Sequence, residues 1–227
     1  MADSSRLRPW KTLSSRPIYE NKWMHLREDV AEMPDGRTTI YGVVTFGDCV
    51  GVVPLLADDR VVLVRQWRYV QGDARWEIPT GGVGRDEPLE AAAQRELAEE
   101  AGYHAGRLRH LCSYYTSKSV CRETAHLYLG EDLAAAEVPR DETEFLEVAA
   151  FPFAEAVQMA VDGTIMDSMS IIALLWNRTA VVPASAAPAS AAPASVVSAP
   201  AVTPGPVGIE AIRVWTAQWT FDVRPRD

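Results

Sequence analysis

The residues best suited to chemistry in this sequence are three glutamates, Glu96, Glu99 and Glu100. They lie in the segment Glu87–Ala101, which is rich in Ala, Glu and Leu and lacks glycine, so the sequence predicts a helix there. Because a helix turns by about 100° per residue, the three carboxylates share roughly a 100° arc. Like charges at this spacing repel, and Arg95 alone cannot neutralise all three. A hard divalent cation can, and Mg2+ binds a few carboxylates while keeping positions for water and phosphate.

A solvated acidic face is the alternative, since adjacent glutamates on alanine-rich helices are commonly no more than that. The flanking residues favour the metal site instead. Gly81 and Gly82 lie shortly before the helix, ahead of a glutamate and the Arg-Glu-Leu run. For the helix itself, Pro88 suits the first turn because its missing N–H is not needed there, and Gly102 is a suitable C-cap.

Together these residues resemble the Nudix box, G-x5-E-x7-R-E-U-x-E-E-x-G-U, in which U is a bulky aliphatic residue. Gly81, Glu87 and the run Arg95–Gly102 match every fixed position, and Tyr103 in place of the last aliphatic residue is a minor departure. The resemblance implies an enzyme that hydrolyses a nucleoside diphosphate linked to another group, with Mg2+ or Mn2+ as its cofactor.

The resemblance also implies roles for individual residues. Four groups would bind the metal: the Thr80 carbonyl and the carboxylates of Glu96, Glu99 and Glu100, of which Glu99 is also a catalytic candidate. Four residues would shape the box: Gly81, Glu87, Arg95 and Gly102. The bound metal would neutralise the pyrophosphate oxygens and lower the pKa of the attacking water. A base outside the helix is expected, because the box carboxylates would be engaged with metal.

The ADP-ribose and nucleotide-sugar pyrophosphatase branch of the family is the most similar. The stretches Val64–Arg68, Trp76–Pro79 and Asp141–Val148 resemble that branch, which places its base or water-orienting carboxylate in the last of them. Glu142 and Glu144 are both eligible, and the alternative is a solvated acidic loop.

Four residues are candidates for substrate binding by resemblance: Trp23, Tyr41, Arg68 and Glu77. Arg68 would bind diphosphate oxygens through its planar fork, or else form a surface salt bridge. Trp23 and Tyr41 would stack on the base, one from each subunit, or else belong to the core. Because such sites use an N-terminal hairpin exchanged between subunits, the resemblance implies a homodimer.

The loop Tyr114–Val120 lacks the Pro-Gly pair that many ADP-ribose pyrophosphatases carry after the box. The prediction is therefore hydrolysis of ADP-ribose or a related nucleoside diphosphate sugar to a nucleoside monophosphate and a sugar phosphate. The alternatives are a housecleaning pyrophosphatase for nucleoside triphosphates and a sensing module that has lost catalysis.

The expected fold class is α+β, a Nudix-type α/β/α sandwich with a mixed sheet and an N-terminal antiparallel hairpin. The hairpin would join 23–33 to 38–46 around a Pro-Asp-Gly turn, and a second hairpin would join 49–56 to 61–67. Further strands are predicted at 108–116, 125–130 and 146–151, and helices at 153–161 and 167–177, the last with Asp167 as its N-cap.

Composition suggests how the chain is organised. We expect an N-terminal extension at 1–16, the Nudix domain at 17–180, an Ala/Pro/Ser-rich linker at 181–207 and an apolar segment at 208–227. The net charge of -9 argues against nucleic acid as a partner, and the lack of a long apolar run argues against a membrane. Three cysteines without a secretory signal suggest a cytoplasmic protein whose partner is a small-molecule nucleotide.

Overall fold

The chain divides into two units, Met1–Ala184 and Ser185–Asp227. The computed structural model describes residues 8–136 and 146–181, all within the first unit. Val181, the first residue of the predicted linker, instead ends helix α3 (Ser168–Val181). The rest of the linker, the apolar C-terminal segment, Glu142 and Glu144 lie outside the described residues.

Two sheets form the centre of the first unit. One has the strand order β7-β4-β10-β8, in which β10 is parallel to β4 and the other neighbours are antiparallel. Its strands are β4 (Cys49–Pro54), β7 (Thr80–Gly82), β8 (Tyr103–Tyr115) and β10 (Thr124–Ala135). The other sheet has the order β11-β5-β6 and is antiparallel. Its strands are β5 (Arg60–Arg68), β6 (Asp73–Glu77) and β11 (Glu147–Pro152).

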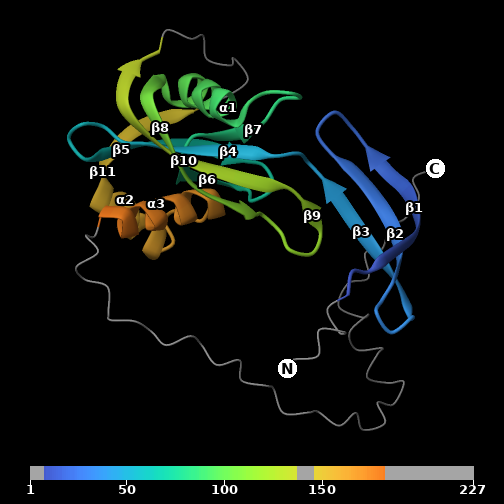
Figure 1. The fold of residues 1–227 in the computed structure, drawn as a ribbon. Coiled ribbons are helices and arrows are strands. Elements are labelled where there is room, and N and C mark those ends of the chain that lie inside the picture. Colours follow the sequence, from blue (N-terminus) through green and yellow to red (C-terminus); the bar gives the residue numbers. More distant parts are fainter. Residues whose placement is uncertain (1–7, 137–145, 182–227) are drawn as a thin grey trace, which may run out of the picture. The chain divides into compact units, whose positions relative to one another are not determined.

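Helices cover both faces of these sheets. They are α1 (Leu89–Glu96), which continues as the π-helix η2 (Leu97–Ala101), α2 (Phe153–Val161) and α3 (Ser168–Val181). Alternate residues of β5 point to opposite sides: Val62 and Val64 pack with α1 and η2, whereas Val61 and Leu63 pack with α2 and α3. Figure 1 shows α1 on one side of the strands and α2 and α3 on the other. The predicted α+β class and α/β/α sandwich are confirmed.

A third sheet contains the N-terminal strands, in the order β1-β2-β3-β9. Its strands are β1 (Lys11–Glu20), β2 (His25–Glu32), β3 (Thr38–Thr45) and β9 (Cys121–Arg122). The predicted hairpin is confirmed, because β2 and β3 pair antiparallel around Gly36, whose φ is 84°. The strand β1 was not predicted, and it crosses the expected boundary between residues 16 and 17.

The predicted second hairpin is wrong. The strands β4 and β5 both form, but they enter different sheets and share only the single bridge between Leu55 and Val61. The reason lies in burial: β4 is buried along nearly its whole length, so it needs a partner on each side and takes β7 and β10.

The helix that carries the three glutamates follows the sequence prediction closely. It begins after Pro88 and ends at Gly102, which adopts the left-handed conformation with φ of 76° and donates its N–H to the Ala98 carbonyl at 3.1 Å. Its last turn, which contains Glu99 and Glu100, is a π-helix, a feature often found at functional sites. Elsewhere α2 has the predicted bounds, and no helix of the described residues is long and apolar enough to span a membrane.

We predict that Gly102→Ala lowers the free energy of unfolding by about 1–2 kcal/mol, because a Cβ disfavours the left-handed conformation. Gly42→Ala is the control, since Gly42 lies in β3 without a positive φ and has open space for a Cβ. Urea unfolding monitored by circular dichroism measures both. Equal midpoints for the two variants would contradict the role of Gly102 as the C-cap.

Candidate active site

Arg95 connects the helix to the loop that precedes it. Its Nε and Nη2 atoms donate to the two carboxylate oxygens of Glu87 at 2.9 and 3.0 Å, and Nη2 also donates to the Gly82 carbonyl at 3.0 Å. Its Nη1 atom donates to Glu96 Oε1 at 2.6 Å and to Glu99 Oε2 at 3.2 Å. One guanidinium therefore contacts three carboxylates and a backbone carbonyl, which fixes the loop on the helix.

Glu87 is the loop's counterpart to Arg95. Besides its bonds to the guanidinium, it accepts the Gly84 N–H at 2.8 Å. The hydrogen bonds from Arg95, and then the one from Gly84, lower the pKa of Glu87 to about 2. The same contacts raise the pKa of Arg95, so this pair stays ionised at neutral pH.

Glu96 and Glu100 are both buried against β7, with 8% and 3% of their surface exposed. Glu100 accepts the Thr80 N–H at 2.8 Å. The Glu96 carboxylate lies against Gly81, where a Cβ would come within 2.0 Å of it. The backbone of β7 therefore holds two of the three predicted metal ligands, and only glycine leaves room for the first.

These donors fit a hard divalent cation in chemical type. Carboxylate oxygens of Glu96, Glu99 and Glu100 are the ligands that Mg2+ and Mn2+ prefer, and two of them lie beside the Thr80–Gly81 backbone. Within residues 8–136 and 146–181, no three acidic, His or Cys side chains are already arranged around a common point. Arg95 instead holds Glu96 and Glu99, so a cation must compete with the guanidinium for these oxygens.

A pocket of about 470 Å3 opens beside the box. We call it the box pocket. Its lining includes Arg68, Glu77, Thr80, Asp167, Ser168 and Met169. Thr80 belongs both to this pocket and to the contact with Glu100, so a ligand in the pocket lies next to the glutamates.

Arg68 and Glu77 form an ion pair inside the box pocket. Nη2 of Arg68 lies 2.8 Å from Glu77 Oε1, and Nε donates to Oε2 at 3.1 Å. Burial raises the pKa of Glu77, while the charge of Arg68 opposes this shift. Because the Glu77 side chain is buried and 41% of the Arg68 side chain is exposed, the pair is not an exposed surface salt bridge. Its arginine remains accessible to an anionic ligand.

The start of α3 contributes the pocket residues that sequence reasoning missed. Asp167 caps the helix as predicted, accepting the N–H groups of Met169 at 3.3 Å and Ser170 at 2.7 Å. Ser170 Oγ in turn accepts the Ile78 N–H at 2.8 Å, which ties α3 to the segment before the box. The capping signal was visible in the sequence, but nothing in it indicated that this cap borders the box pocket.

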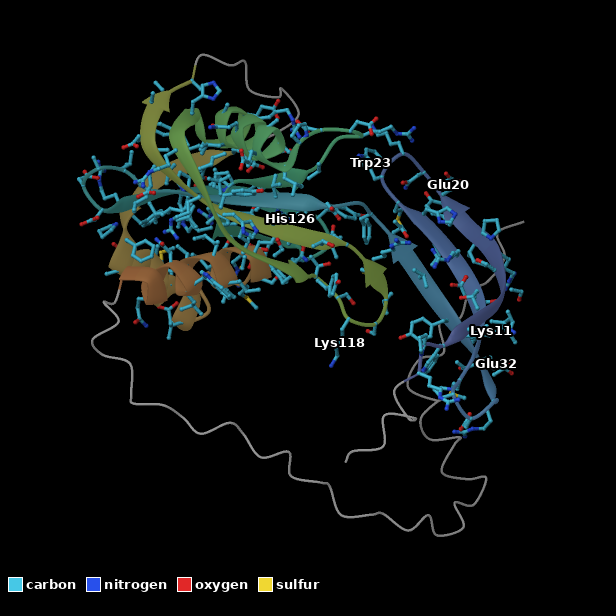
Figure 2. The ribbon with its side chains drawn as sticks, in the orientation of Figure 1. Lys11, Glu20, Trp23, Glu32, Lys118 and His126 are labelled. Atoms are coloured by element: carbon cyan, nitrogen blue, oxygen red, sulfur yellow. The ribbon has the colours of Figure 1, made fainter. Side chains whose placement is uncertain are left out.

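Tyr41 lies in β3 and Trp23 in the turn between β1 and β2 (Figure 2 labels Trp23), and neither lines the box pocket. Trp23 is 69% exposed, so it is not a core residue, and Lys22 Nζ lies 4.0 Å from its ring centre. Tyr41 meets Trp10 edge-on with ring centres 6.1 Å apart. Their role in base stacking stays a prediction, as does the choice between Glu142 and Glu144.

Comparison with known proteins agrees with this geometry. A model of the NUDIX domain matches residues 45–169, and a model of the nucleoside diphosphate sugar hydrolase N-terminal domain matches residues 10–44. The chain therefore belongs to the Nudix family and is a hydrolase of that family.

Curated relatives include two Bacillus proteins. The chain is 31% identical to the methanol dehydrogenase activator of Bacillus methanolicus and 30% identical to the ADP-ribose pyrophosphatase of Bacillus subtilis. Each match covers 72% of this chain and 90% of the relative. The GDP-mannose pyrophosphatase of Klebsiella pneumoniae is 30% identical over 72% of this chain and 89% of its own. The crystal structure of an ADP compounds hydrolase shares the fold, with a TM-score of 0.70, 22% identity and coverage of 76% and 94%.

We predict that Gly81→Ala weakens Mn2+ affinity by about tenfold or more, because the new Cβ displaces the Glu96 carboxylate. The unfolding midpoint should change little, since the displaced atoms are at the end of a flexible side chain. Gly82→Ala is the matched control, because a Cβ there meets open space. Isothermal titration calorimetry measures both variants. Equal Mn2+ affinities would exclude Glu96 as a ligand held at Gly81.

The ion pair of Glu87 predicts a pH dependence of stability. A carboxyl whose pKa is lowered by folding stabilises the protein above its ordinary pKa of 4.5, and this contribution disappears as the pH falls toward 2. The stability difference between wild type and Glu87→Gln should therefore be constant above about pH 5.5 and shrink between pH 4.5 and 2. Urea unfolding across this range measures it. Glu90→Gln is the control, because Glu90 is exposed in α1 and has no ion pair with any described residue. It should show no comparable difference. A pH-independent effect of Glu87→Gln would contradict the prediction.

Proposed function

We propose that the protein hydrolyses the pyrophosphate bond of ADP-ribose or a related nucleoside diphosphate sugar, giving a nucleoside monophosphate and a sugar phosphate. The observation that carries this proposal is the junction at Thr80, where the buried glutamates of the box meet a pocket containing an accessible arginine. Relatives named ADP-ribose pyrophosphatase and GDP-mannose pyrophosphatase support the same substrate class.

Nudix hydrolases generally use divalent metal ions. We propose Mg2+, with Mn2+ as a substitute, held by Glu96, Glu99, Glu100 and the Thr80 carbonyl. When bound, the ion would offset the charge of the diphosphate and lower the pKa of a ligand water. Four carboxylate and carbonyl oxygens suit this ion better than zinc, for which His and Cys are the usual ligands.

The protein's own groups would then orient the substrate and move the proton. Arg68 would donate to diphosphate oxygens, and Glu77 would keep its guanidinium in place through the two contacts described above. Glu142 or Glu144 would accept the proton of the attacking water, with Glu99 as a further catalytic candidate. Arg95 and Glu87 would keep the loop and the helix in register throughout.

We propose a homodimer in which Trp23 and Tyr41 stack on the base. Both aromatic side chains are exposed in the single chain, which supports a contact with the partner subunit or the substrate.

We propose a cytoplasmic location. It is supported by Cys49, Cys112 and Cys121, all of which are free thiols in the structure.

Hydrolysis of nucleoside triphosphates is the second candidate. It would use the same box, but it gives no reason for Arg68 and Glu77 to line a pocket beyond the glutamates. A sensing module without catalysis is disfavoured because the three box glutamates are all present.

The test is product analysis in 18O-labelled water with ADP-ribose, GDP-mannose, UDP-glucose and ATP. We expect a nucleoside monophosphate and a sugar phosphate from at least one sugar nucleotide, with hydrolysis abolished by EDTA. Glu100→Gln should lower kcat by about 100-fold or more, whereas Glu90→Gln should not. Turnover of ATP alone would favour the second candidate, and wild-type activity in Glu100→Gln would remove the metal assignment.

A further inference from the structure

A second pocket, of about 740 Å3, lies where β4 and β10 begin and where the segment between β8 and β10 runs. We call it the loop pocket. The lining residues that matter here are Asp48, Tyr115, Ser117, Lys118, Arg122 and Glu123. None of them belongs to the Nudix box, and none was assigned a role by the fold or the proposed function.

The wall of the loop pocket is held by hydrogen bonds. Ser117 Oγ accepts the N–H groups of Ser119 at 3.4 Å and Val120 at 3.3 Å, which closes a turn. The Val120 carbonyl accepts the Val44 N–H at 2.9 Å, and β9 then pairs with β3. Figure 2 shows Lys118 extending from this turn, away from the ribbon.

The charges of the loop pocket differ from those of the box pocket. Both arginines lining the box pocket are already paired, Arg68 with Glu77 and Arg75 with Asp73. Lys118 and Arg122 form no ion pair with any residue in the described part of the chain, and both are exposed. The loop pocket therefore contains two cations without an ion-pair partner among the described residues, together with the carboxylates of Asp48 and Glu123.

The other lining groups suit a sugar. The Tyr115 side chain is 77% exposed, which leaves a ring face for stacking on a sugar ring. Glu123 offers oxygen acceptors for hydroxyl groups, and the Ser117 hydroxyl, whose oxygen already accepts two N–H groups, can donate its proton. Asp48 already lies 3.4 Å from His126 Nε2. A polyhydroxylated group that carries a carboxylate or phosphate would use the ring, these polar groups and both cations.

The side chain of Cys49 lies between the loop pocket and the box pocket. Its Sγ is 3.8 Å from the carbonyl oxygen of Thr124, which lines the loop pocket, and 3.9 Å from Sδ of Met169, which lines the box pocket. Tyr114, the neighbour in sequence of Tyr115, has its hydroxyl 3.3 Å from that of Ser168, which lines the box pocket. One side chain therefore separates residues that line the two pockets.

We propose that the loop pocket binds the group attached to the distal phosphate, and that Lys118 and Arg122 make the enzyme prefer substrates in which this group carries a negative charge. This inference rests on the proposed function and adds a substrate class to it. Lys118 lies in the loop that lacks the Pro-Gly pair expected by resemblance, and Arg122 follows that loop in β9.

UDP-glucuronate and UDP-glucose form a matched pair of probes, because they differ only at C6 of the sugar. Glucuronate has a carboxylate there, and glucose has a hydroxymethyl group. The measurement is kcat/KM for both in wild type, Lys118→Met, Arg122→Gln and the double variant. We expect wild type to favour UDP-glucuronate, each single variant to lower that preference by about twofold to fivefold, and the double variant to lower it by about tenfold. Arg107→Gln is the control, since it removes an exposed charge from β8 far from the loop pocket and should leave the preference unchanged.

The outcomes separate the two proposals. Hydrolysis of both probes without a preference, or a preference that survives in the double variant, overturns the role of Lys118 and Arg122 and leaves the proposed function intact. An equal loss in Arg107→Gln also overturns it, because the effect would then reflect net charge alone. If wild type hydrolyses neither probe and no other sugar nucleotide, the proposed function fails and this inference fails with it.

Discussion

The site depends on one guanidinium surrounded by carboxylates. Without Arg95, Glu96 and Glu99 would lose a positive partner, and the loop from Gly82 to Glu87 would lose its hydrogen bonds to the helix. Hydrogen bonds between ionised partners are among the stronger ones in proteins, and Arg95 forms such bonds with Glu87, Glu96 and Glu99. The positions of Glu87, Glu96 and Glu99 follow from this network.

The short strand β7 also fixes the positions of two glutamates of the box. Its backbone donates to Glu100 and leaves space beside Gly81 for Glu96, so both carboxylates are held against a sheet rather than in solvent. Since β7 pairs with β4, the same central strand also sets the place where the loop pocket begins. The two pockets therefore share a rigid support, although the residues that line them come from distant parts of the sequence.

Much of the fold could be predicted because its signals are local. Pro88 and Gly102 mark the helix, β-branched runs mark β4 and β5, and Asp167 marks the start of α3. The choice of strand partners could not be predicted in this way, since β4 and β5 are neighbours in the chain but belong to different sheets.

The strand β1 was missed for a similar reason. It contains Pro17, a residue tolerated in a sheet mainly at an edge or an irregularity, and the register with β2 shifts between Pro17 and Tyr19. Within the site, the box residues were found because their spacing on one helix brings them together. The contribution of α3 was not, because 92 residues separate Ile78 from Ser170 and only tertiary packing joins them.

The contacts of Arg95 with Glu96 and Glu99 have a consequence for the metal-free enzyme. A built-in counter-ion offsets part of the repulsion between these carboxylates when no cation is present. Binding of a cation at Glu96 and Glu99 would then exchange one positive partner for another. Its affinity would depend on how readily the arginine yields those oxygens as much as on the oxygens themselves.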